Sequence, residues 1–149
     1  MPISIRALAA ALMAAALVGC GRDATGPKAL ASAVAAARQR WAAASPSDYT
    51  FTASRACECL SGAAGPARVV VRGGNVTDAK LVWNDSTVAT NLWFTVPQLF
   101  DLIERELAER PDLVEAAFDS ELGYPTSVKY GQIEVDAGAV ITVMGFTRP

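Results

Sequence analysis

The sequence predicts an α+β fold in which two helices pack against an antiparallel β-sheet. Segments with helical spacing of apolar residues alternate with short β-branched segments, in the order helix, two or three strands, helix, three strands. Neighbouring strands separated from the helices in this way favour an antiparallel sheet covered by helices. We expect a single domain over residues 28–149, since this length suits one hydrophobic core. The repeated order leaves open a distant duplication, although no matching residues support one.

The start of the chain has the features of a cleaved lipoprotein signal peptide. Arg6 precedes an apolar run over residues 7–18, which is shorter than the roughly 20 residues of a transmembrane helix. The run ends in a Leu-Val-Gly-Cys motif whose cysteine is Cys20. An ordinary signal peptide cleaved near Cys20 is the alternative. We expect residues 1–19 to be removed and residues 20–27 to form a lipidated tether.

Lipid on Cys20 would hold the protein on a membrane surface on the extracytoplasmic side. A diacylglyceryl group plus an N-acyl chain supplies several chains, each contributing about 0.8 kcal/mol per buried methylene. Gly21 follows the cysteine where an aspartate would favour retention at the inner membrane. We therefore expect a cell-envelope protein, on the outer membrane if the organism has one.

The composition favours a noncatalytic protein over an enzyme. The chain has no histidine, which removes the usual general base and the commonest zinc ligand. Its formal net charge is −2, and the charges are well mixed, so we expect no nucleic-acid partner. We identify no catalytic residues, no metal ligands and no cofactor site.

The first half of the domain contains one predicted helix and three strand segments. Residues 28–44 place Leu30, Val34, Ala37 and Trp41 at helical spacing. Residues 49–52 alternate large apolar and hydroxyl side chains, as a half-buried strand does. Residues 69–71 form a valine run, and Gly73-Gly74 suits a hairpin turn to a partner strand at Val76. Residues 78–92 give no firm assignment.

The second half begins with the clearest helix, over residues 96–110. Thr95 is its expected N-cap, and Gln98 completes a capping box. Pro111 ends the helix. Three strands are expected at residues 113–118, 126–130 and 139–146, with Gly123-Tyr124-Pro125 as a turn. The predicted core residues are Trp41, Phe51, Val70, Phe100, Ile103, Val128 and Val143.

Cys57-Glu58-Cys59 is the most unusual local motif. Outside the cytoplasm these two thiols are expected to oxidise. Residues two apart on a straight strand have Cα atoms about 6.6 Å apart, at the edge of the disulfide range, so a bridge needs a bent backbone. A structural disulfide between Cys57 and Cys59 is our first interpretation. A redox function, a thiolate metal site and unpaired thiols are the alternatives.

An acidic set surrounds the Gly123-Tyr124-Pro125 turn. Its members are Asp119, Glu121, Glu134 and Asp136. Oxygen ligands suit calcium, but the spacing matches no EF-hand loop. Solvated turn residues are the favoured interpretation, and a calcium-dependent module is the alternative.

An ordered set of motifs carries a family resemblance. The set comprises Trp41, Tyr49-Thr50-Phe51, Cys57-Glu58-Cys59, Pro66, the run from Val69 to Val76, Thr95-Val96, Leu99-Phe100, Ile103, Phe118-Asp119, Gly123-Tyr124-Pro125-Thr126 and Asp136. With these residues the chain resembles the bacterial secreted and lipid-anchored "domain of unknown function 6174" group. The resemblance implies a surface lipoprotein domain, and it implies no activity and no catalytic residues. Sequences of the group look more acidic after the Gly-Tyr-Pro segment, whereas this chain has the uncharged residues Tyr130-Gly131-Gln132 and Ala137-Gly138 there. This difference weakens the case for an ion-binding role.

These observations lead to one expected function and two alternatives. The expected function is a membrane-anchored domain that binds an envelope protein, peptide or glycan without catalysing a reaction. The first alternative is a thiol-redox protein that uses Cys57 and Cys59. The second is a calcium-dependent module that uses Asp119, Glu121 and Asp136.

Overall fold

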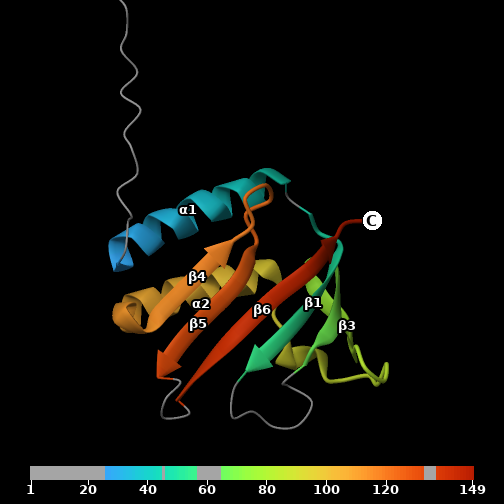
Figure 1. Ribbon diagram of the computed structural model, residues 1–149. Helices are drawn as coiled ribbons and strands as arrows, with labels where there is room; N and C mark the ends of the chain where they lie inside the picture. The colour runs from blue at the N-terminus through green and yellow to red at the C-terminus, as the bar shows by residue number, and fades with distance from the viewer. Residues whose placement is uncertain (1–25, 45, 57–64, 133–136) are drawn as a thin grey trace, which may run out of the picture.

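The computed structural model describes residues 26–44, 46–56, 65–132 and 137–149. These residues form two α-helices, six strands and two short 3-10 helices (Figure 1). In chain order they are α1 (Pro27–Ala44), β1 (Tyr49–Ala56), β2 (Ala67–Arg72), β3 (Asn75–Leu81), η1 (Thr90–Leu92), α2 (Val96–Glu109), η2 (Pro111–Leu113), β4 (Val114–Phe118), β5 (Pro125–Gln132) and β6 (Ala137–Thr147). In the described part of the chain, no helix has the length and apolar character needed to cross a membrane.

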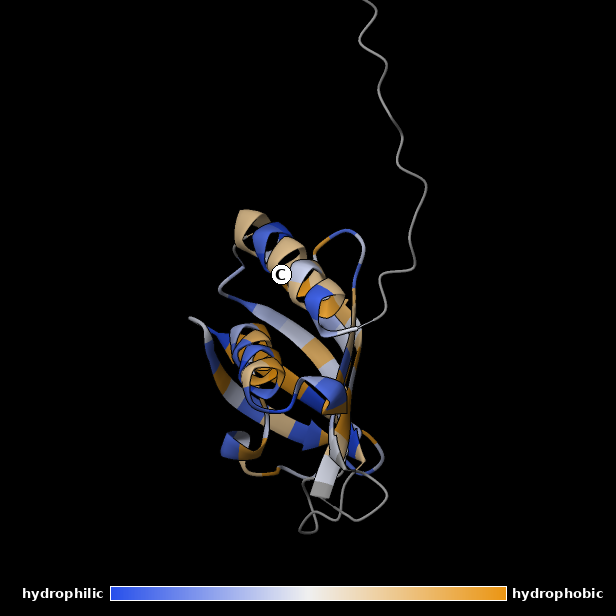
Figure 2. Ribbon diagram, turned by 90° about the vertical axis from the view of Figure 1, so that its left-hand side faces the viewer, coloured by the Kyte–Doolittle hydropathy of each residue, from blue (hydrophilic) through white to orange (hydrophobic). Residues whose placement is uncertain are grey.

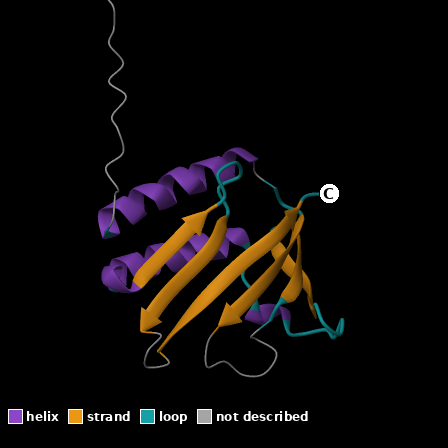
Figure 3. Ribbon diagram, viewed as in Figure 1, coloured by secondary structure: helices purple, strands orange, loops and turns teal. Residues whose placement is uncertain are grey.

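The six strands form one antiparallel sheet, and both helices cover the same face of it (Figures 2 and 3). The strand order is β3-β2-β1-β6-β5-β4, so the last strand of the chain lies in the middle, against β1. This arrangement confirms the predicted α+β class. It also means that the sheet is completed only when the two ends of the domain meet.

The two helix-plus-three-strand units do not superpose. In the first unit the leading strand, β1, is central and β3 is at the edge, whereas in the second the leading strand, β4, is at the edge and β6 is central. Because both helices lie on one face, the two units wind with opposite hands, and no rotation relates them. The structure therefore gives no support to a duplication.

The core lies between the sheet and the helices, and strand alternation selects its residues. On β1, Tyr49, Phe51 and Ala53 are buried, and the residues between them are only partly covered. In register with Tyr49 and Phe51 are Val71 and Val69 on β2, both 0% exposed. Val70 therefore points to the opposite face, and its predicted place in the core is wrong. Three consecutive valines satisfy either alternation, so only the pairing of β2 decides which of them is buried.

The other predicted core residues are confirmed. Trp41, Phe51, Phe100, Ile103, Val128 and Val143 are all buried. Three of the four residues predicted for the apolar stripe of α1 are also buried, and the fourth, Leu30, packs at its margin. Around Trp41, the ring of Phe146 lies edge-on at 5.7 Å and that of Tyr49 at 5.3 Å. The stripe thus anchors α1 against the central strands.

The predicted helix boundaries agree closely with the structure, whereas β1 runs four residues beyond its predicted end at Thr52. α1 begins at Pro27, one residue before the expected start. The capping box of α2 is present, with Thr95 and Gln98 exchanging hydrogen bonds, and the helix ends at Glu109 before Pro111. Gly73 and Gly74 both have positive φ, as a type I′ hairpin requires. Leu113, expected to begin a strand, belongs instead to η2.

Arg38 joins the two helices across the top of the core. Its guanidinium lies 2.7 Å from Asp101 and 3.0 Å from Glu104. It also lies over the ring of Phe100, 5.1 Å from the centroid. These partly exposed contacts link α1 to α2, and α1 forms one wall of the groove described next.

Candidate binding groove at the edge of the sheet

The two edges of the sheet differ, because the last three residues of β3 pair with a returning segment of the chain. At the β3 edge the chain turns back after Leu81, and the N–H of Val88 donates to the carbonyl of Ala79 at 2.9 Å. Lys80 on β3 and Thr87 on the returning segment form an antiparallel β-bridge. At the opposite edge β4 pairs only with β5 among the described residues. Proteins commonly cover or blunt strand edges, so the bare edge of β4 is the notable one.

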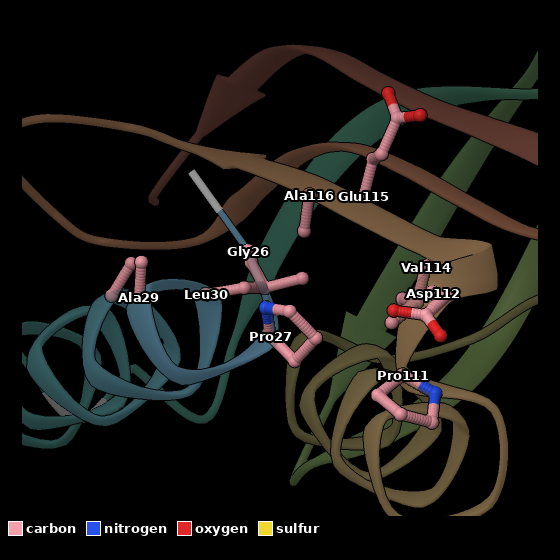
Figure 4. Close-up of a pocket in the computed structure, with 10 residues that line it drawn as sticks. Gly26, Pro27, Ala29, Leu30, Pro111, Asp112, Val114, Glu115 and Ala116 are labelled. Atoms are coloured by element: carbon pink, nitrogen blue, oxygen red, sulfur yellow. The ribbon is translucent and has the colours of Figure 1, made fainter. Parts of the chain in front are cut away.

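A groove of about 510 Å³ lies between this edge and the start of α1 (Figure 4). Its walls are mostly small or apolar: Gly26, Pro27, Ala29, Leu30, Ala33, Pro111, Val114 and Ala116. Alanines on α1 leave space where larger side chains would fill the gap against β4. The α1 helix and η2 thus form two sides of a channel beside the backbone of β4.

The charged residues of the groove wall are both acidic. They are Asp112 on η2 and Glu115 on β4. Glu115 is exposed and lies 3.3 Å from Lys129 on β5. Asp112 is exposed and is the middle residue of η2. The groove therefore combines an unpaired strand edge, apolar walls and a negative margin.

The predicted cysteine sites lie outside the described residues. Cys20, the expected lipidation site, precedes residue 26, and Cys57 and Cys59 fall between β1 and β2. The structure therefore does not test the lipid anchor or the disulfide. It does place the ends of β1 and β2 side by side, with Ala53 opposite Ala67.

The acidic set is brought together only in part. Glu134 and Asp136 lie outside the described residues. Asp119 serves the turn, because its carboxylate accepts from the backbone N–H groups of Glu121 at 3.1 Å and Leu122 at 2.6 Å. No cluster of three metal-binding side chains occurs in the part of the chain that the structure describes. Asp119 thus has a structural role in the turn over residues 119–123, and Pro125, which was predicted to lie in the turn, is instead the first residue of β5.

The start of α2 offers no anion site, since its backbone donors are already used. The N–H of Val96 donates to the hydroxyl of Tyr49, and that of Gln98 donates to Thr95. The N–H of Leu99 donates to the carbonyl of Thr95, and Pro97 has none. A helix N-terminus binds anions through free N–H groups, and these are satisfied within the chain.

Sequence reasoning identified the β4 segment as a strand but did not identify the groove. The small side chains of α1 signalled helix propensity and gave no indication of a neighbouring cavity. Whether a strand lies at an edge depends on pairing with distant segments. The available signal was the short length and sparse charge of residues 113–118, which alone do not distinguish an edge strand from a central one.

In the described part of the chain, the fold is an α+β fold with a groove beside its edge strand β4, which pairs only with β5. The chain belongs to the Family of unknown function (DUF6174), whose model matches residues 33–148. This match confirms the family resemblance drawn from the sequence motifs, while the bacterial origin and the lipid anchor stay predictions. No curated protein and no solved structure matches the chain.

Proposed function

We propose that this protein is a lipid-anchored binding domain of the cell envelope that receives an extended polypeptide segment along β4. The observation that carries the proposal is the β4 edge, which has no second strand partner among the described residues and lies beside the 510 Å³ groove. An added strand would pair its backbone with the edge and place alternate side chains in the groove, as in other cases of β-strand addition. The mechanism requires no catalytic residue.

The lining indicates the chemistry of the bound segment. Leu30, Val114 and the alanines favour small apolar side chains at alternate positions. Asp112 favours a lysine or arginine beside it, because opposite charges steer association and fix register, whereas Glu115 is already paired with Lys129. The proposed ligand is therefore an extended, alternating apolar segment that carries a basic residue.

The proposed anchor places this groove close to the membrane. Gly26 and Pro27 line the groove, and the stretch from Cys20 to Gly26 spans at most about 20 Å when fully extended. A partner bound along β4 would then lie within reach of the same membrane. This geometry favours a membrane-associated envelope protein as the source of the segment.

A pair of alanine substitutions on α1 tests the groove. Ala33→Lys would place a long side chain in the groove, whereas Ala35→Lys adds the same charge to an exposed position outside it. Photocrosslinking from position 33 in cells would identify the partner segment, and a synthetic peptide of that sequence would then be titrated. We expect bound peptide to slow amide exchange over residues 114–118, and Ala33→Lys alone to weaken binding.

Two results would contradict this proposal. One is equal binding by the two lysine variants, or unchanged exchange of the β4 amides when peptide binds. The other is a dimer of the purified protein with β4 amides already protected, because a second copy would then occupy the edge. The anchor has a separate test: Cys20→Ala should release the protein from membranes or leave unprocessed precursor, and normal membrane fractionation with normal maturation would refute lipidation.

A further inference from the structure

A polar hollow of about 320 Å³ lies beside the segment that leads into α2. Its lining residues come from the start of β3, from η1 and the residues after it, and from the first turn of α2: Asn75, Val76, Thr90, Asn91, Trp93, Phe94, Thr95 and Gln98. None of these lining residues is charged, although five of them carry an amide or a hydroxyl group. Because a charged ligand would find no counter-charge in this lining, the hollow suits a neutral polar ligand.

Two amide side chains of this lining are held in defined orientations by backbone partners. The side-chain oxygen of Gln98 accepts from the backbone N–H of Thr95 at 2.8 Å, as part of the capping box. The side-chain nitrogen of Asn75 donates to the carbonyl of Gly73 at 3.0 Å. Among the described residues, the nitrogen of Gln98 and the oxygen of Asn75 have no such partner. The lining therefore offers one amide donor and one amide acceptor to a ligand.

Trp93, which also lines the hollow, carries a donor without an acceptor. It is 4% exposed, and within the described part of the chain its indole Nε1 is buried with no hydrogen-bond partner. A buried tryptophan N–H usually has an acceptor, because an unpaired buried donor destabilises the folded state. An oxygen atom of a molecule bound in the hollow would supply the missing acceptor. The unpaired indole is thus a second observation that indicates a ligand here.

We propose that this hollow binds a neutral sugar that carries an N-acetyl group. The carbonyl of that group is an uncharged acceptor for the side-chain nitrogen of Gln98. The indole N–H of Trp93 would donate to a second sugar oxygen, and the side-chain oxygen of Asn75 would accept from a sugar hydroxyl. Val76 and Phe94 supply the apolar part of the lining, against which the C–H groups of the sugar ring would pack.

The lining favours a sugar over an extended peptide. A bound peptide strand takes most of its affinity from backbone pairing and places alternate side chains in apolar pockets. Here most of the lining side chains carry amide or hydroxyl groups, which suit the hydroxyls of a sugar. The hollow is also separate from the β4 groove, because β3 and β4 lie at opposite edges of the sheet and the two sites share no lining residue. Neither proposal depends on the other.

Nuclear magnetic resonance observes the two proposed donors directly. The sample is the isotope-labelled chain from residue 21 onward, which includes every described residue. The indole N–H of Trp93 and the side-chain amide of Gln98 give separate signals. We expect N-acetylglucosamine to shift both signals until they saturate. Glucose, which lacks the N-acetyl group, and N-methylacetamide, which lacks the ring, should shift them far less at the same concentration.

Gln98→Glu removes the proposed donor and keeps the capping box. Glutamate accepts from the N–H of Thr95 as glutamine does, so the thermal stability should be retained. A carboxylate does not donate to the acetyl carbonyl, so binding of N-acetylglucosamine should weaken about tenfold or more. Gln39→Glu makes the same chemical change at an exposed position of α1 outside the hollow. This matched control should bind the sugar as the wild type does.

Several outcomes would overturn the proposal. They are no shift with N-acetylglucosamine, an equal shift with glucose, undiminished binding by Gln98→Glu, or an equal loss of binding in the Gln39→Glu control. A shift of the Gln98 signal without one of the Trp93 signal would contradict the contact assigned to the indole. If N-methylacetamide shifts both signals as strongly as the sugar does, the hollow takes amide groups such as those of peptides and the sugar proposal fails.

Discussion

The hydroxyl of Tyr49 accepts a 3.0 Å hydrogen bond from the backbone N–H of Val96. Tyr49 is the first residue of β1, and Val96 is the first residue of α2. They are 1% and 0% exposed, so the bond is out of contact with water. It joins β1 to the first residue of α2. The capping box does not use the N–H of Val96, so without Tyr49 this donor would have no partner.

Tyr49→Phe should destabilise the domain by about 1–3 kcal/mol, because it leaves the buried N–H of Val96 without a partner. Urea denaturation of the wild-type and variant chains from residue 21 onward measures the difference. Tyr130→Phe, at a half-buried position, is the control and should have a smaller effect. Equal stability of Tyr49→Phe and the wild type would contradict the role assigned to this bond.

Gly123→Ala should cost more stability than Gly74→Ala. Both glycines have nearly the same positive φ, +80° and +75°, where alanine costs about 1–2 kcal/mol. A Cβ at Gly74 would meet nothing, whereas one at Gly123 would overlap the carbonyl oxygen of Ala37 on α1. Thermal denaturation of the two variants separates the backbone cost from the packing cost. Equal losses would show that the turn is free to move away from α1.

The stability of the domain should fall in alkaline solution through two tyrosines. Burial raises the pKa of Tyr49 above its ordinary value of 10.0, and hydrogen bonds from Val96 and Thr95 partly offset this rise. Burial and the negative charge of Asp119 raise the pKa of Tyr124. Because both pKa values are higher in the folded state, the associated stability is fully present below about pH 10 and is lost as the pH rises through the folded values.

The double variant Tyr49→Phe, Tyr124→Phe checks this pH dependence. Urea midpoints measured from about pH 8 to about pH 11 cover the expected window. The variant should be less stable than the wild type at neutral pH, and it should lose less additional stability as the pH rises. Parallel pH profiles for the two proteins would rule out the assigned origin of the alkaline loss.

The Cys57–Cys59 pair is expected to be an oxidised structural bridge. A structural disulfide of an extracytoplasmic protein should have a reduction potential below about −300 mV. Equilibration in thiol–disulfide buffers, followed by alkylation and mass measurement, gives this value. A distinctly higher potential would favour the redox alternative, and a pair of free thiols in the secreted protein would exclude the bridge.

Features set by nearby residues were predictable from the sequence. The capping box at Thr95 depends on Gln98, three residues away, and the turn at Gly73-Gly74 depends on the freedom of glycine at positive φ. The apolar stripe of α1 follows from helical periodicity alone. The family match also agrees with the motifs in the sequence.

Features that depend on distant pairing required the tertiary structure. Residues 78–92 had no clear pattern, because after β3 they form a turn, an edge-covering segment and η1, each held by contacts elsewhere in the fold. The burial of Val69 and Val71 instead of Val70 depends on the register with β1. The groove exists because β4 lies at an edge and small residues of α1 face it.

By itself, the sequence determined the helices, the turns and most of the core, because local periodicity and capping act over a few residues. It also predicted the lipid anchor at Cys20 and the Cys57–Cys59 bridge, which stay predictions. Only the tertiary structure decided the strand order, the edge position of β4 among the described strands and the pairing of residues 79–81 at the β3 edge. Strand order follows from pairing between residues up to about a hundred positions apart, such as Thr50 and Thr147, and no local pattern encodes such a pairing.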